Sequence, residues 1–352
     1  MSLDLAGALR YPPPRPLWLA THVEDILEPR LPIVDAHHHI WAQEGQIYDL
    51  EALCGDITTG HKVVATVLVQ AHHAYRQHGP AHLRCVGETE HIEQQIRARG
   101  DAGAPPFLCA GIVGFADLLL GDAVAEVLEA HHVASPARFR GVRHSVSRDS
   151  NFPAGIVLRP APARLLADPQ YRRGLATVMR HGLSYDAMLY HQQIPELTAL
   201  ATELVDLSIV LDHFGCVLGV GPYADTKQAT FDRWRSDIRE LARCPNVTVK
   251  LGGMGMIICG ANYHERAAPP GSAELAQAWR PYVETCIEAF GAQRCMFESN
   301  FPVDKGMFSY AVVWNAFKRL CAGATKAEKA ALMGGTAARV YRLPPAVHAA
   351  LE

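Results

Sequence analysis

The stretch Ile33–Trp41, Ile-Val-Asp-Ala-His-His-His-Ile-Trp, constrains the fold more than any other part of the sequence. Its apolar start predicts a short buried strand, Ile33–Ala36, that runs directly into three imidazoles. Side chains alternate along a strand, so His37 and His39 share one face while His38 points to the other. Two imidazoles about 6–7 Å apart on one face can bind a single divalent ion. A solvated run of polar residues is the alternative, and the apolar residues on both sides argue against it.

Short apolar runs recur along the rest of the chain, with helical or polar segments between them. The predicted strands after the first are 63–70, 107–115, 139–146, 183–190, 208–214, 247–251 and 295–297. The predicted helices are 88–99, 123–132, 171–181, 194–204, 231–242, 273–290 and 310–320. Strands that are apolar on both faces and alternate with helices form a covered parallel sheet. At 352 residues, this pattern predicts a single-domain α/β fold, a distorted (β/α)8 TIM barrel.

The predicted strands end in polar residues. These are His37, His38 and His39, then Gln70, His72 and His73, then Asp117, then Arg143 and His144, then Tyr190 and His191, then Asp212 and His213, then Lys250, and finally Glu298, Ser299, Asn300 and nearby Asp304. Structural polar residues would not favour one edge of every strand. In a (β/α)8 barrel the C-terminal edge carries the active site, so the sequence predicts an active site there.

Composition excludes several classes of protein. Lys plus Arg number 33 against 36 Asp plus Glu, and the net charge of -3 provides no basic surface for nucleic acid. The longest apolar runs, such as Val63–Val69, are too short to span a bilayer. Nine cysteines without a Cys-x-x-Cys pair, and a start that does not resemble a secretory signal, predict a protein of the reducing cytoplasm. A homo-oligomer is compatible with these features.

Three parts of the chain are expected. Residues 1–30, with the run Pro12–Pro16, form an extended arm over the barrel or a neighbouring chain. Residues 31–343 form the barrel, and residues 344–352 form a tail.

Five segments together resemble a known family. They are Asp35–Trp41 (Asp-Ala-His-His-His-Ile-Trp), Arg140–His144 (Arg-Gly-Val-Arg-His), Val210–Gly215 (Val-Leu-Asp-His-Phe-Gly), Asn246–Leu251 (Asn-Val-Thr-Val-Lys-Leu) and Cys295–Pro302 (Cys-Met-Phe-Glu-Ser-Asn-Phe-Pro). In this order they resemble the amidohydrolase superfamily (amidohydrolase 2 type), in the branch of sugar lactonases and pyrone dicarboxylate hydrolases. The resemblance covers roughly residues 31–343. The combination of segments is specific, whereas any one of them is weak.

The resemblance implies a metal site at the strand ends. It implies that His37 and His39 are metal ligands from the first strand, and that His191 and His213 are the imidazoles of the fifth and sixth strands. One of the latter two would bind the metal, and the other would hydrogen-bond the substrate or its water. In the family the eighth strand usually ends Gly-Ser-Asp-Trp-Pro, and its Asp binds metal and accepts a proton from the attacking water.

The chain departs from the family at this last position, where Asn300 replaces the Asp. An amide cannot act as a general base near neutral pH. Three alternatives stay open: Asn300 ligates through its carbonyl oxygen, Glu298 supplies the carboxylate, or Asp304 folds back from the following loop. His213 completes the set of candidate catalytic residues.

Candidate substrate-binding residues lie at the other strand ends. A guanidinium at Arg143 suits a carboxylate or lactone oxygen through a forked contact, and Lys250 could polarise a carbonyl. Tyr190 and His144 could also contact substrate. For Arg143 and Lys250 the alternative is an internal ion pair, and for Tyr190 it is a local hydrogen bond.

The strand-end residues together with the resemblance imply a metal-dependent hydrolase, a lactonase that opens a carboxylated or polyhydroxylated sugar lactone or pyrone-type lactone. By ligand type the metal is zinc or manganese. The alternatives are a metal-independent lactone hydrolase on the same residues, a decarboxylase or isomerase of the superfamily, and a binding protein whose site has decayed.

Overall fold

The computed structural model describes residues 11–43, 46–100, 105–152 and 160–352. Its centre is an eight-stranded parallel sheet in the order β1-β4-β5-β6-β7-β8-β9-β10. The strands are β1 Pro32–His38, β4 Lys62–Val69, β5 Phe107–Gly114, β6 Phe139–Val142, β7 Ser184–Ala187, β8 Ser208–Leu211, β9 Val247–Leu251 and β10 Cys295–Phe297. The order follows the chain, as the predicted (β/α)8 barrel requires.

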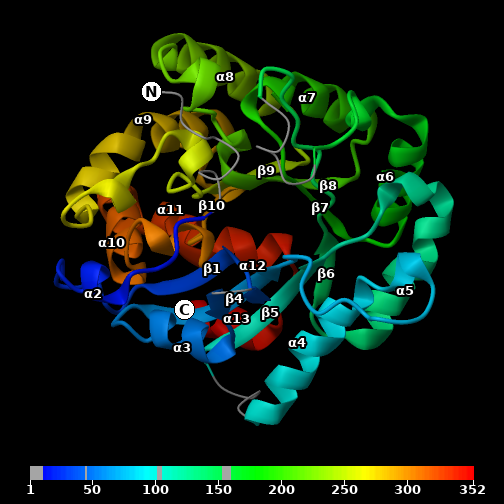
Figure 1. Cartoon of the computed structure of the whole chain (residues 1–352), viewed down its shortest axis with the longest axis horizontal. Helices are drawn as coiled ribbons and strands as arrows, with labels where there is room; N and C mark the ends of the chain where they lie inside the picture. Colours follow the sequence, from blue (N-terminus) through cyan, green and yellow to red (C-terminus); the bar gives the residue numbers. More distant parts are fainter. Residues whose placement is uncertain (1–10, 44–45, 101–104, 153–159) are drawn as a thin grey trace.

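Helices surround the strands, as Figure 1 shows. They are α2 Pro16–Leu19, α3 Leu50–Ile57, α4 Val86–Arg99, α5 Val124–Ala134, α6 Pro169–Arg180, α7 Ile194–Glu203, α8 Lys227–Leu241, α9 Ser272–Phe290, α10 Tyr310–Leu320, α11 Lys326–Ala330, α12 Thr336–Val340 and α13 Pro345–Leu351. The strands are almost completely buried because helices cover their outer faces and side chains fill the barrel. The prediction of a distorted TIM barrel is confirmed.

The ring closes between the ends of the first and last strands. His38 bridges Phe301 in parallel register, and His39 N donates to Phe301 O at 2.7 Å. Asn300 N donates to His37 O at 3.0 Å. Because these contacts lie beyond β10, the seam of the barrel is made by the same residues that carry the first imidazoles.

Several predicted strands extend too far. The fourth, fifth and sixth predicted strands reach residues 146, 190 and 214, whereas β6, β7 and β8 end at Val142, Ala187 and Leu211. Beyond these points the apolar residues are buried outside the sheet: Val146 N donates to Met188 O at 2.9 Å, and Trp234 Nε1 of α8 donates to Phe214 O at 2.7 Å. The apolar runs in the sequence therefore extend beyond the residues that pair with neighbouring strands.

Some elements were not predicted from the sequence. A small antiparallel hairpin, β2 Trp41–Gln43 with β3 Gln46–Tyr48, follows β1. Residues 345–351, in the segment expected as a tail, form α13, and Val347 is fully buried beneath the barrel. Of the expected arm, residues 1–10 lie outside the described residues. Within the described residues, no helix has the length and apolarity needed to cross a bilayer.

Candidate functional site

The imidazoles of His37 and His39 converge at the C-terminal edge of the barrel. Their Nε2 atoms lie 3.1 Å apart, and both side chains are buried. His39 Nδ1 contacts Val69 O at 2.8 Å, which fixes the direction of its other nitrogen. His38 points outward, where its Nε2 lies 2.9 Å from Thr66 Oγ1. The structure therefore divides the three histidines as strand alternation predicts.

The carboxylate of Glu298 holds two imidazoles. One oxygen lies 2.9 Å from His37 Nδ1, and the other lies 2.7 Å from His213 Nδ1. Burial alone would raise the pKa of Glu298, but the two imidazoles outweigh it and hold the pKa at about 2. For the imidazole of His213, burial favours the neutral form and lowers the pKa. Glu298 and then Asp212 raise it, and the net shift of the His213 pKa is upward. Glu298 is therefore an ionised residue whose two oxygens each lie against one imidazole, with a hydrogen bond to His213 and an ion-pair contact to His37.

Below these rings lies a buried ion-pair network. Lys250 Nζ is 2.8 Å from Asp186 and 3.0 Å from Asp212, and it also lies 3.2 Å from His37 Nδ1. Tyr341 OH donates to Asp186 at 2.6 Å from the bottom of the barrel. Burial opposes the charge on Asp212, but Lys250 and then His37 hold its pKa well below the usual range. Each of these buried charges requires an opposite charge beside it, because a buried charge without a partner is strongly destabilising.

Arg143 reaches the cluster from the end of β6. Its NH2 donates to Gln70 O at 2.6 Å, while NH1 lies 3.4 Å from His37 Nε2 and 3.5 Å from Asp212. Its Nε is buried without a hydrogen bond. The side chain is 11 % exposed, so the guanidinium lies between the buried cluster and the opening.

Asp304 and Asn300 form the other side of the site. Asp304 Oδ2 accepts from Gly255 N at 3.0 Å, and Oδ1 accepts from Asn300 Nδ2 at 3.1 Å. The side-chain oxygen Oδ1 of Asn300 is buried and has no hydrogen-bond partner. Burial raises the pKa of Asp304 to about 7, although His213 lowers it in part. Asp304 has thus folded back over the barrel, close to His213.

The backbone around these residues is specialised. His213 and Asn300 adopt left-handed conformations, with φ of 54° and 55°. Such conformations are costly for residues other than glycine and occur often at functional sites. A Cβ at Gly253 would lie 2.5 Å from His213 Nδ1, and one at Gly255 would lie 2.7 Å from the Asp304 carboxyl carbon. The glycine-rich segment after β9 therefore allows the chain to pass directly beside both side chains.

Three predicted site residues, His191, His144 and Tyr190, have their contacts outside the cluster around His37. His191 Nδ1 accepts from Leu218 N at 3.3 Å, and its ring lies against Tyr223. His144 Nδ1 accepts from Leu118 N at 3.2 Å, in the loop after β5. Tyr190 packs edge-on against Phe152 above the barrel. Burial lowers the pKa of His191 to about 4, which keeps this imidazole neutral.

The sequence analysis assigned no role to two carboxylates of the cluster: it named Asp212 only as a polar strand-end residue, and it did not name Asp186. Among the described residues, one possible metal-ligand atom from each of Asp212, His37 and His213 lies within 4.8 Å of the other two. The position of Asp212 directly before His213 was a usable signal. Asp186 faces the barrel interior from β7, two residues after Ser184, and polar residues alternating in an otherwise apolar strand would have indicated it.

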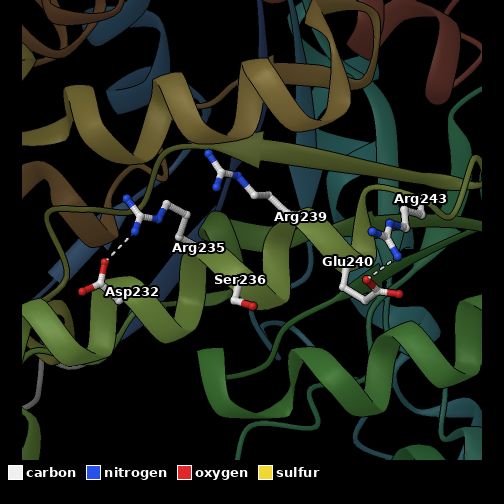
Figure 2. Close-up of a pocket in the computed structure, with 6 residues that line it drawn as sticks. All are labelled: Asp232, Arg235, Ser236, Arg239, Glu240 and Arg243. Carbon is white, nitrogen blue, oxygen red and sulfur yellow. Dashed lines mark hydrogen bonds and ion pairs between the residues drawn. The ribbon is translucent and has the colours of Figure 1, made fainter.

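A groove on the outer surface of α8 is separate from this cluster. Figure 2 shows the six side chains that line it, Asp232, Arg235, Ser236, Arg239, Glu240 and Arg243. Arg235 pairs with Asp232 at 2.8 Å, and Arg243 pairs with Glu240 at 2.8 Å. Because acidic neighbours neutralise these arginines, the groove offers little free charge to a ligand.

Comparison with known proteins places the chain among amidohydrolases. The profile of the amidohydrolase family matches residues 34–343. An uncharacterised protein of Sinorhizobium fredii is 32 % identical over 88 % of this chain and 98 % of its own length. An L-fucono-1,5-lactonase of Burkholderia multivorans is 29 % identical over 90 % of this chain and 98 % of its own length.

Solved structures agree with this fold. A crystal structure of an amidohydrolase from Burkholderia multivorans with bound zinc has a TM-score of 0.66 and 25 % identity, covering 89 % of this chain and 99 % of that one. A structure described as a 2-pyrone-4,6-dicarboxylic acid hydrolase from Pseudomonas putida has a TM-score of 0.56 and 19 % identity, covering 89 % and 98 %. At that identity the second similarity concerns the fold alone.

Proposed function

The chain belongs to the amidohydrolase family, and from this premise we propose that it is a metal-dependent hydrolase that opens a small cyclic ester. The proposed substrate is a sugar lactone or a pyrone-type lactone. The convergence of His37, His39 and His213 with buried carboxylates at one barrel opening supports this proposal. The L-fucono-1,5-lactonase of Burkholderia multivorans, similar over nearly the whole chain, supports the choice of a lactone.

The residues of the cluster fit a divalent ion. Imidazole nitrogens combined with a carboxylate suit zinc, and manganese is the second choice. Both oxygens of Asp212 are buried and make no hydrogen bond. One lies 3.0 Å from Lys250 Nζ and the other lies 3.5 Å from Arg143 NH1, so this carboxylate is ionised and could also serve as a metal ligand. We assign the metal ligands to His37, His39, His213 and Asp212. His191 is left out of this set because its ring contacts Leu218 and Tyr223.

Such an ion, when bound, supplies Lewis acidity, which polarises an ester carbonyl and makes water more acidic. The protein must then provide a group that takes a proton from the attacking water. Asp304 suits this role because burial raises its pKa to about 7, near the pH at which a general base works best. Glu298 suits it less, since each of its oxygens already contacts an imidazole. We therefore propose Asp304 as the base and Glu298 as the residue that orients His37 and His213.

The two cations of the cluster would have different roles. Arg143 has an unpartnered Nε and a partly exposed side chain, so its guanidinium can bind the carbonyl oxygen or a carboxylate of the substrate. Lys250 is fully buried between Asp186 and Asp212 and is better suited to balance their charge. Tyr190 and His144 would at most shape the outer wall of the site.

A metal-independent lactone hydrolase is the second candidate, and one observation favours it. Both ring nitrogens of His37 have a cation nearby, Lys250 Nζ at 3.2 Å and Arg143 NH1 at 3.4 Å. In that case Arg143 would polarise the lactone carbonyl directly, and His39 or His213 would hydrogen-bond the substrate.

The proposed function is tested by product analysis on a panel of compounds. The purified enzyme, with zinc added, is incubated with aldono-1,5-lactones, L-fucono-1,5-lactone, 2-pyrone-4,6-dicarboxylate and hydroxybenzoic acids. We expect ring-opened acids from at least one lactone. Release of carbon dioxide from an aromatic acid without lactone opening would contradict the proposal and indicate a decarboxylase.

A further inference from the structure

The described part of the N-terminal arm, residues 11–30, is anchored to the barrel by polar contacts. Glu24 accepts hydrogen bonds from Ser272 N at 2.6 Å and from Asn315 Nδ2 at 3.1 Å. Lys318, itself 1 % exposed, donates to Leu27 O at 2.7 Å. Figure 1 shows the dark blue arm running from α2 toward the middle of the barrel, near β10. The arm therefore belongs to the folded barrel.

The described end of the arm lies on the loops that carry the site. Tyr11 stacks on Trp41, with ring centroids 5.7 Å apart and an interplanar angle of 18°. Trp41 in turn stacks on His39, with centroids 5.8 Å apart and an angle of 19°. On the other side, a Cβ at Gly306 would lie 2.1 Å from Pro12 O, so the arm also packs tightly on the turn that contains Asp304.

Trp41 and Tyr11 differ in what they offer to a ligand. Trp41 is 3 % exposed, and its ring lies between Tyr11 and His39, so it can only hold these two rings in place. Tyr11 is 37 % exposed, so part of this residue can be reached by a ligand. A tyrosine in this position can contact a ligand with both an apolar face and a hydrogen-bonding tip.

The charged groups that act on the Tyr11 hydroxyl are those of the site, in agreement with its position beside Trp41. Loss of solvent raises the pKa of its hydroxyl, Arg143 lowers it, and Cys216 and Asp304 raise it. The guanidinium that we assign to the substrate and the carboxylate that we assign as base therefore both act on this hydroxyl. Arg143 follows the fourth barrel strand and Asp304 lies in the loop after the eighth. The Tyr11 hydroxyl is therefore influenced by charged groups from two different parts of the barrel opening.

We propose that Tyr11 is a substrate-binding residue, delivered to the barrel opening by the N-terminal arm and supported there by Trp41. Its ring would pack against the C–H face of a lactone ring, and its hydroxyl would hydrogen-bond a ring substituent such as a hydroxyl or carboxylate. Trp41 is a positioning residue that connects this contact to His39. The identity of the ligand rests on the proposed lactone hydrolysis. The position of Tyr11 at the barrel opening does not depend on that proposal.

Steady-state kinetics of three variants test the substrate contact. Tyr11→Phe removes the hydroxyl and keeps the stack, Tyr11→Ala removes both, and Leu17→Ala is the control because Leu17 lies on the same arm and is 88 % exposed. We expect Tyr11→Phe to raise KM for the best lactone by about tenfold, the loss of one hydrogen bond, with little change in kcat. Tyr11→Ala should raise KM further, and Leu17→Ala should leave it unchanged. Wild-type KM values in both Tyr11 variants would overturn the proposal.

A second measurement needs no turnover. N-bromosuccinimide oxidises accessible indoles, and peptide mass spectrometry gives the rate at each tryptophan. Because Tyr11 covers one face of Trp41, Trp41 should be oxidised faster in Tyr11→Ala than in the wild type, while Trp18, which lies on the arm away from this stack, should react equally in both. Equal rates at Trp41 would overturn the placement of Tyr11. A wild-type enzyme that opens no lactone would refute the proposed function, and this measurement would still decide on Tyr11.

Discussion

Asp304 Oδ1 accepts a hydrogen bond of 3.1 Å from the side-chain amide of Asn300. In the family that the chain resembles, an aspartate usually occupies the position of Asn300, whereas this chain has a neutral donor there and a carboxylate four residues later. The acidic group is therefore displaced along the chain while the same corner of the barrel opening still contains one. This relationship predicts how the two positions respond to substitution.

Restoring the family residue alone should harm the enzyme. In Asn300→Asp two buried carboxylates would face each other at hydrogen-bond distance, and one of the pair would bind a proton more tightly. We expect lower activity at pH 7 and a shift of the acidic limb of the rate profile to higher pH by at least about one unit. The exchange Asn300→Asp with Asp304→Asn keeps a single carboxylate and should recover part of the activity. Higher activity in the single variant than in the wild type would contradict this arrangement.

Loss of the Asp304 carboxylate should abolish most of the activity. General bases contribute about 10²–10⁴-fold, so Asp304→Asn should lower kcat by at least about a hundredfold. Because the pKa of Asp304 is about 7 and a base must be ionised, wild-type activity should rise as the pH increases through 7 and then level off. Asp225→Asn, at an exposed position, is the control and should keep the wild-type profile. A full loss of activity in Glu298→Gln together with an unchanged Asp304→Asn would assign the base to Glu298.

Glu88 provides a test of stability against pH. Its Oε1 accepts from Ala71 N at 2.7 Å and from His73 N at 3.3 Å, and burial raises its pKa from 4.5 to about 7. A carboxyl whose folded-state pKa is raised stabilises the protein below pH 4.5, and this contribution is lost as the pH rises through 7. Glu88→Gln keeps the accepting oxygen without the charge. Relative to wild type, we expect it to gain up to about 3 kcal/mol of unfolding free energy between pH 4.5 and 8.5.

Urea unfolding at several pH values measures this difference. Glu129→Gln, at an exposed position on α5, is the matched control and should follow the wild-type curve. A constant difference between Glu88→Gln and wild type across this pH range would mean that Glu88 does not take up its proton on folding.

Lys250 should be essential for folding stability. Lys250→Met leaves Asp186 and Asp212 buried without their shared cation, which typically costs about 3–5 kcal/mol. The double variant Lys250→Met with Asp186→Asn removes one of the stranded charges and should recover part of this loss. Urea unfolding at pH 7 gives both values. An unfolding free energy of Lys250→Met equal to that of the wild type would mean that the ion-pair network does not form.

The sequence predicted the barrel because each strand is apolar on both faces and is followed by a helix. It predicted the meeting of His37 and His39 because alternation along a strand needs no knowledge of the rest of the fold. It could not separate His191 from His213, since that depends on how each loop turns after its strand. His213 enters a left-handed turn beside Gly253, whereas His191 begins a short helical turn against Leu218.

The site also depends on contacts between distant segments, which no local pattern contains. The position of Asp304 follows from the turn after β10 and from its hydrogen bond to Gly255. Tyr11 reaches the opening only because Glu24 and Lys318 anchor the arm to α9 and α10. Such residues can be identified only from the folded structure.

Metal analysis combined with lactone turnover tests the account most directly. Wild-type enzyme, His37→Ala and the control His348→Ala, whose imidazole is exposed on α13, are loaded with zinc, desalted and assayed together. The account predicts about one zinc per chain and lactone opening in the wild type and in His348→Ala, with both lost in His37→Ala. Full lactone opening by wild-type protein that retains no metal would contradict it.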